Sequence, residues 1–159
     1  MIPVNTYRNL WLYMASVIPG IHHAFTVHEE SDMAAAIRDI DQNDIILIAV
    51  VPSAEIEATS ADDVEEIDSC YVFLVKKTDL GSLMHDEFIT ELHETQVLMT
   101  AVKRKLIELS GDTEHLTPYS HTLHRLMIHG MHTDPEYNLL GCNGWGLSFK
   151  LKTKGTFNL

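Results

Sequence analysis

The stretch 84–109 constrains the fold most, because its large apolar residues recur at the spacing of one face of an α-helix. Asp86 and Glu87 lie in the first turns of this stretch, where the helix dipole favours negative charge, and Gly111 follows its end. The apolar stripe consists of Phe88, Leu92, Met99, Val102, Leu106 and Leu109, with Ile89 and Leu98 beside it. Burying about seven such side chains is worth roughly 10–20 kcal/mol, so we expect a sheet to pack against this helix.

The rest of the chain divides into two further helical patterns and several runs typical of strands. The run IILIAVV at 45–51 is apolar at every position, which indicates a strand buried on both faces. The run WGLSFKLKT at 145–153 alternates apolar and polar residues, which indicates a strand with one buried face. In chain order we expect a helix at 5–17, an extended piece at 21–28, a short helix at 31–40, strands at 45–51 and 70–75, the long helix, and strands at 119–131 and 145–153.

This order predicts a single α+β domain that spans residues 1–159. We expect a mainly antiparallel sheet of about four strands, packed on one side against the long helix and the N-terminal helix. A chain of 159 residues is long enough to bury one core of this kind. A turn is expected at 134–136, where Asp, Pro and Glu follow one another.

The segment between the two central strands, 53–69, is too long for a simple hairpin loop. It begins SAEIEAT, in which glutamates alternate with small or apolar residues, so the strand pattern of 45–51 continues past Pro52. We therefore expect the first strand to continue outward as an extended acidic hairpin arm, with residues 61–67 at its tip.

The net charge of −12 is concentrated in one region. Residues 29–68 carry thirteen acidic side chains and one basic one, whereas the rest of the chain carries ten of each. A surface of this sign repels phosphates, which argues against sequence-specific nucleic acid as a partner. The sequence also has no apolar run of about 18 residues and no basic stretch ahead of its first apolar segment, so we expect neither a membrane partner nor a signal peptide.

Ten histidines raise the question of a metal site, and four of them follow one another closely near residue 125. On the strand expected here, the first and third would face one way and the second and fourth the other. Zinc requires three or four converging ligands, so we expect no metal site and no cofactor. The four histidines are His121, His124, His129 and His132.

The sequence contains no pattern typical of nucleophilic or phosphate chemistry. Cys70 and Cys142 lack neighbours that would lower a thiol pKa, and no serine lies in a Gly-x-Ser-x-Gly elbow. Because the chain shows no export signal, we expect two free thiols. The acidic pairs of the arm lie where catalytic geometry is hard to hold. We therefore expect no catalytic residues and no enzymatic activity.

Lysines alternate along the last strand and are opposite in sign to the arm. Surfaces of opposite sign on one subunit favour head-to-tail contacts between copies, which close into a ring when the rotation permits. The alternative is that both are ordinary solvated faces. The candidate interface residues are Glu55, Glu57, Asp62, Asp63, Glu65 and Glu66 on the arm, and Lys150, Lys152 and Lys154 on the last strand.

The segment 138–152, NLLGCNGWGLSFKLK, places a turn and a Gly-Trp pair before an alternating strand. In this respect it resembles the C-terminal end of small virion connector proteins of tailed bacteriophages. The order of elements along the chain is also similar to theirs. The family is the tail-terminator, or tail-completion, group of proteins that join the phage head to the tail.

This resemblance implies a structural component of the virion without catalytic activity. It implies a homo-oligomer, a hexameric ring at the head-proximal end of the tail tube, with other virion tail and neck proteins as partners. Its location would be the virion, and the host cytoplasm during assembly. One alternative is a small non-catalytic α+β module that binds a basic partner through its acidic loop. Another is a metal-dependent hydrolase that uses some of the histidines.

Overall fold

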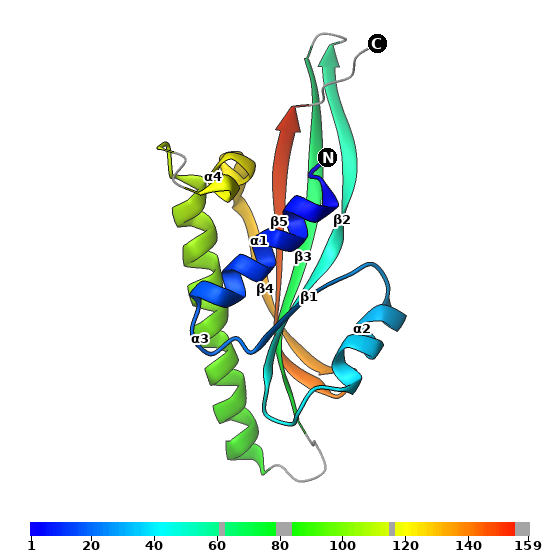
Figure 1. Ribbon diagram of the computed structural model, residues 1–159, viewed down its shortest axis with the longest axis vertical. Coiled ribbons are helices and arrows are strands. Elements are labelled where there is room, and N and C mark those ends of the chain that lie inside the picture. The colour runs from blue at the N-terminus through cyan, green and yellow to red at the C-terminus, as the bar shows by residue number, and fades with distance from the viewer. Residues whose placement is uncertain (61–62, 79–83, 115–116, 155–159) are drawn as a thin grey trace.

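The helices and strands follow the expected order, with one short helix more than the sequence predicts. The computed structural model describes residues 1–60, 63–78, 84–114 and 117–154. None of the helices in these ranges is long and apolar enough to cross a membrane. The elements in chain order are α1 (Val4–Val17), β1 (His23–Val27), α2 (Glu30–Arg38), β2 (Ile45–Ser60), β3 (Asp63–Lys77), α3 (His85–Ser110), α4 (Pro118–Leu123), β4 (Leu126–Leu139) and β5 (Cys142–Lys154) (Figure 1).

The described strands form one five-stranded sheet of order β1-β2-β3-β5-β4. β1 runs parallel to β2, and every other pair of neighbours is antiparallel. The expected class, α+β with a mainly antiparallel sheet, is confirmed. The sheet has five strands rather than about four, because β1, with only five residues, is too short for its pattern to identify it as a strand.

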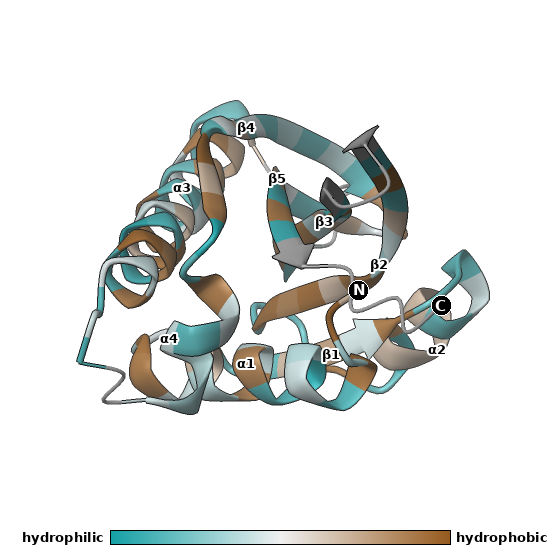
Figure 2. Ribbon diagram, turned by 90° about the horizontal axis from the view of Figure 1, so that it is seen from above, coloured by the Kyte–Doolittle hydropathy of each residue, from teal (hydrophilic) through white to brown (hydrophobic). Residues whose placement is uncertain are grey.

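α1 and α3 pack on one face of the sheet, as their apolar stripes predict. In this core the Trp11 ring of α1 lies with its centroid 5.7 Å from that of Tyr7 and 6.2 Å from that of Phe149 on β5. Figure 2 looks along the sheet and shows α1 and α3 lining it, with α2 set apart from them. The buried side chains of α3 are Leu92, Thr95, Met99, Val102, Leu106 and Leu109.

α2 packs on the opposite face, where its Met33 and Ile37 belong to a second buried cluster. Ile46 and Ile48 of β2 join this second cluster. The alternate residues of β2 join the core under α1 and α3, namely Ile45, Leu47 and Ala49. The prediction that 45–51 forms a strand buried on both faces is therefore confirmed for residues 45–49, which enter the two cores in turn.

β2 and β3 run past the helices as a long hairpin, which confirms the expected arm (Figure 1). The tip differs from the expected 61–67. Residues 63–67 belong to β3 and pair with β2, and residues 61–62 lie outside the described ranges. β5 accompanies β3 as far as the pair Glu65↔Lys154, so much of the arm is a three-stranded sheet. We use the name arm for β2 beyond Pro52 together with the residues of β3 and β5 that lie level with it in the sheet.

The expected strand at 119–131 is wrong in its first half. α4 occupies Pro118–Leu123, and β4 begins only at Leu126. α4 starts where the Thr117 hydroxyl accepts a hydrogen bond from the Ser120 N–H, with Pro118 in the first turn. Both features favour a helix start. The alternation of apolar residues does not distinguish one short helix from a strand.

The expected turn at 134–136 is also wrong, since these residues lie inside β4 and pair with β5. Pro135 is tolerated there because β4 is an edge strand, where a missing N–H leaves the ladder intact. The chain reverses instead between β4 and β5. Leu140 (φ 51°) and Gly141 (φ 80°) adopt there the left-handed conformation typical of a tight hairpin.

Gly144 of β5 lies so close to β3 that an added Cβ atom would overlap the Leu74 carbonyl oxygen and lie 2.8 Å from the Val75 Cα. Gly144→Ala must push two paired strands apart, so we expect it to lower the free energy of unfolding by about 3 kcal/mol. The matched control is Gly130→Ala on β4, where the added atom would be 3.6 Å from its nearest backbone neighbour. Urea unfolding of both variants measures the difference, and equal losses would contradict this packing.

Candidate interaction surface

The residues that the sequence suggests as an interface lie on the three strands of the arm and its base. Asp62 alone among them is outside the described ranges. The others are Glu55 and Glu57, exposed on β2; Glu65 and Glu66, partly buried on β3; Lys150, exposed, and Lys152, partly buried, on β5; and Asp63 and Lys154, at the arm ends of β3 and β5.

The structure places the acidic arm and the lysine strand side by side rather than on separate surfaces. Lys152 Nζ lies 2.8 Å from Glu65 Oε2, and Arg125 Nη1 lies 3.4 Å from Glu65 Oε1. One carboxylate therefore holds two cations of the same subunit. Glu55 and Glu57 on β2 remain exposed and give the outer strand of the arm its negative charge.

The contact with Glu65 also affects the ionisation of Lys152. A hydrogen bond to Glu65 and the charge of that carboxylate raise the pKa of Lys152 above its ordinary value of 10.5. Because the pKa of Lys152 is higher in the folded state, its pair with Glu65 stabilises the fold fully below pH 10.5. This contribution is lost as the pH rises through the pKa of the folded state. At neutral pH the ammonium group is therefore charged and engaged within its own subunit.

The two lysines at the end of β3 have structural partners. Lys76 Nζ lies 3.1 Å from Glu94 Oε2 and 3.4 Å from Glu91 Oε1, which ties β3 to α3. Lys77 Nζ donates to main-chain carbonyl oxygens at and after the end of α2, where the helix dipole favours positive charge. Both lysines hold helices against the sheet.

The N-terminal segment is fastened to the base of the arm. The Ile2 N–H donates a hydrogen bond of 3.0 Å to Asp68 Oδ2, and the Asp68 side chain is fully buried. The Met1 ammonium group forms an ion pair with Glu66. These contacts hold the start of the chain against the base of the arm.

A pocket of about 440 Å³ opens at this base. Ile2 and Pro3 form an apolar wall, and Arg125 and Lys152 bring positive charge. None of the described residues that line the pocket is acidic, and both of these basic side chains pair with Glu65 of β3. Its remaining lining residues are Met1, His121, Thr122 and His124.

Two of the four clustered histidines meet in this pocket. The His121 and His124 rings stack with their centroids 5.5 Å apart, and His124 Nδ1 lies 2.6 Å from the His121 carbonyl oxygen. His129 and His132 lie exposed on β4. The expected division of all four between two faces of one strand is therefore wrong. Sequence reasoning missed the pocket because a strand would have separated the first two rings.

The cysteines are buried and free, as expected. Burial, with a contribution from the Asp68 charge, raises the pKa of Cys70 to about 12. Burial raises the pKa of Cys142 to about 11. Both thiols stay protonated at neutral pH, so neither provides a thiolate nucleophile.

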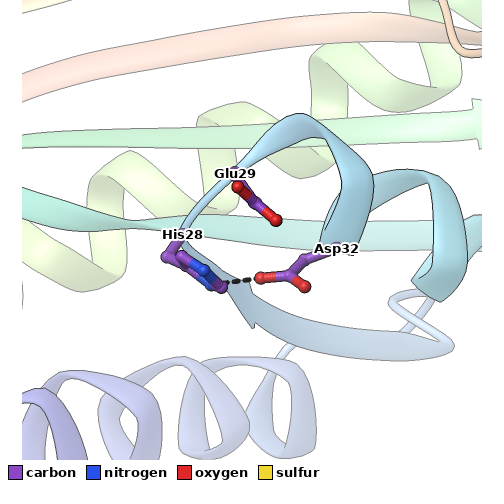
Figure 3. A group of neighbouring side chains, drawn as sticks. All are labelled: His28, Glu29 and Asp32. Atoms are coloured by element: carbon purple, nitrogen blue, oxygen red, sulfur yellow. Dashed lines mark ion pairs between the residues drawn. The ribbon is translucent and has the colours of Figure 1, made fainter.

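The described residues include one group with the side chains of a metal site, at the start of α2 (Figure 3). The ligand atoms of His28, Glu29 and Asp32 lie within 4.8 Å of one another. His28 and Asp32 already form an ion pair across one helical turn, and Glu29 accepts a hydrogen bond from the Ser31 hydroxyl. Acidic residues are favourable at a helix N-terminus, so local contacts account for this arrangement.

No family model, curated protein or solved structure matches the chain. Function therefore has to be inferred from the chain's own geometry. That geometry combines a three-stranded arm, an exposed acidic strand along one side of it, and a pocket with basic side chains at its base.

Replacing Glu65 by glutamine should lower the pKa of Lys152 toward its ordinary value, because the largest contribution to the raised pKa is the hydrogen bond to this carboxylate. NMR titration of the lysine side-chain resonances measures this pKa. The matched control is Glu55→Gln, which removes an exposed carboxylate of the same arm and should leave the Lys152 pKa higher than in Glu65→Gln. Equal Lys152 pKa values in the two variants would show that the pair does not form in solution.

Proposed function

We propose that the chain is a non-catalytic assembly subunit of the tail-terminator or tail-completion kind. In this proposal it closes a homo-oligomeric ring, a hexamer, that joins a phage tail to the head or neck. Its partners are further copies of itself and other virion tail and neck proteins. It acts in the virion, and in the host cytoplasm during assembly.

The observation that carries the proposal is the arm. A hairpin that extends the central strands beyond the helices gives an assembly subunit a means to reach a neighbour. β3 is paired on both sides along much of the arm, which stiffens it. An arm ordered in this way loses little conformational entropy when it docks.

The chemistry of the arm supports a protein surface as its target. Ile56 is 62% exposed on β2, and its side chain points to the opposite face of the strand from those of Glu55 and Glu57. The buried centre of a protein contact is more apolar than the rest of the surface, so Ile56 is suited to that place. In a ring, acidic arms that line the lumen would also repel DNA and let it pass without sticking.

The second candidate is a small non-catalytic module that docks a basic partner through the arm without assembling with itself. The exposed Glu55 and Glu57 favour this candidate, because they remain available after Lys152 and Arg125 have been engaged by Glu65. The two candidates differ in the oligomeric state that they predict.

Native mass spectrometry of the purified chain at low and at moderate salt tests the proposal. We expect a species at six times the 18.0 kDa of one chain that loosens as salt rises, because exposed charges are screened beyond about 10 Å at 0.1 M salt. The variant Glu55→Ser/Glu57→Ser should weaken this species. Its matched control is Asp39→Ser/Asp41→Ser, which removes two exposed charges after α2 and should leave the species intact.

A monomer at every concentration and salt would contradict the ring and favour the docking module. Equal weakening by both double variants would show that net charge, rather than the arm, controls the assembly. Circular dichroism of the two double variants checks that each keeps its fold.

A further inference from the structure

β2 has an open edge along the arm. β1 pairs with β2 only as far as Val50. Beyond that point, among the described strands, β2 pairs with β3 alone as far as Ser60. The main-chain groups on the outer side of such an edge are a template for another strand.

β4 forms the opposite edge of the same sheet. Its first eight residues, from Leu126 to Thr133, include no acidic side chain. Ile128 in this stretch is 48% exposed, and His129 and His132 are exposed as well. This edge therefore offers an exposed apolar residue without the negative charge that marks the arm.

The directions of the strands make these two edges compatible. β2, β3, β5 and β4 alternate in direction across the sheet, so β4 runs opposite to β2. In a head-to-tail contact, β2 of one copy and β4 of the next keep these directions, and the antiparallel alternation continues from one copy to the next. Pairing of the β2 edges of two copies would place the Glu55 and Glu57 carboxylates of one copy beside those of the other, and like charges opposite each other are destabilising.

We propose that the arm edge of β2 pairs with the β4 edge of a second copy, with Ile56 against Ile128. This inference rests on the proposed function, since it specifies which surfaces close the ring. Main-chain hydrogen bonds provide the affinity, and the two isoleucines form a cross-strand apolar pair. Glu55 and Glu57 then lie beside an edge that carries histidines and no acid.

A groove lies beside the start of the open edge. It encloses about 550 Å³ between α1 and β1, and Val51 of β2 contributes to its lining. Val4 and Leu12 in its wall are 49% and 44% exposed, and Arg8 also lines it. β1 occupies the outer side of β2 as far as Val50, so a strand of the second copy can pair with β2 only beyond that residue.

Cysteine cross-linking tests the pairing on the full chain. Ile56→Cys and Ile128→Cys are prepared separately, mixed in equal amounts and oxidised, with the buried native thiols left in place. We expect a disulfide-linked dimer in the mixture that peptide mapping assigns to positions 56 and 128, and little dimer from either variant alone. The matched control is Val97→Cys on α3, 54% exposed, which should form no link with either variant.

Each outcome decides between specific possibilities. Dimers of Ile56→Cys alone would show arm-to-arm contact and overturn the proposed pairing. An oligomer by native mass without the mixed link would also overturn the pairing but leave the ring in place. A monomer at all concentrations would overturn both. Because both isoleucines are exposed, melting temperatures close to that of the unmodified chain are expected for the two variants.

Discussion

The fold depends on burying one sheet from both sides. Along β2, alternate side chains enter the core under α1 and α3, and the residues between them enter the core under α2. A strand in this position has no polar face, so its sequence is a continuous apolar run. The run ends at Pro52, within the register shift between β2 and β3, and no described residue of β2 beyond it belongs to either core. The loss of two-sided cover separates the body of the domain from the arm.

Beyond this point few strand residues belong to a core, Leu151 among them, and other interactions take over. β3 keeps its main-chain pairing with β2 and with β5, and Glu65 collects Lys152 and Arg125 from its neighbours. The buried Asp68 accepts the Ile2 N–H at the base. These contacts hold the inner and middle strands of the arm, but they leave the outer edge of β2 unpaired among the described strands. An ordered arm with one open edge is suited to assembly.

Local patterns in the sequence predicted the elements that have a strong periodicity. The stripe of α3, the doubly buried strand at 45–51 and the alternation at 145–153 each reflect a burial pattern that a helix or strand must satisfy. The patterns did not reveal which strands lie side by side. The partnership of Lys152 with Glu65 depends on the β3–β5 pairing, which joins residues far apart in the chain.

Three further features lie outside what the sequence predicts. The short helix α4 is too small to show a period, and its start depends on the cap formed by Thr117. Pro135 is typical of a turn but also fits an edge strand, and its edge position follows only from the sheet order. The pocket at the arm base combines α4, β5 and the N-terminal segment, so no single stretch of sequence could indicate it.

We propose that the arm assembles copies of the chain through its open edge. Hydrogen–deuterium exchange, compared between dilute and assembled protein, measures this most directly. We expect fast exchange in the dilute chain for the amides of β2 between Ser53 and Ser60 that point away from β3, and for those of the first half of β4 that point away from β5. Both sets should gain protection together on assembly. Assembly with unchanged exchange at both edges, and new protection only on the outer side of α3, would contradict it.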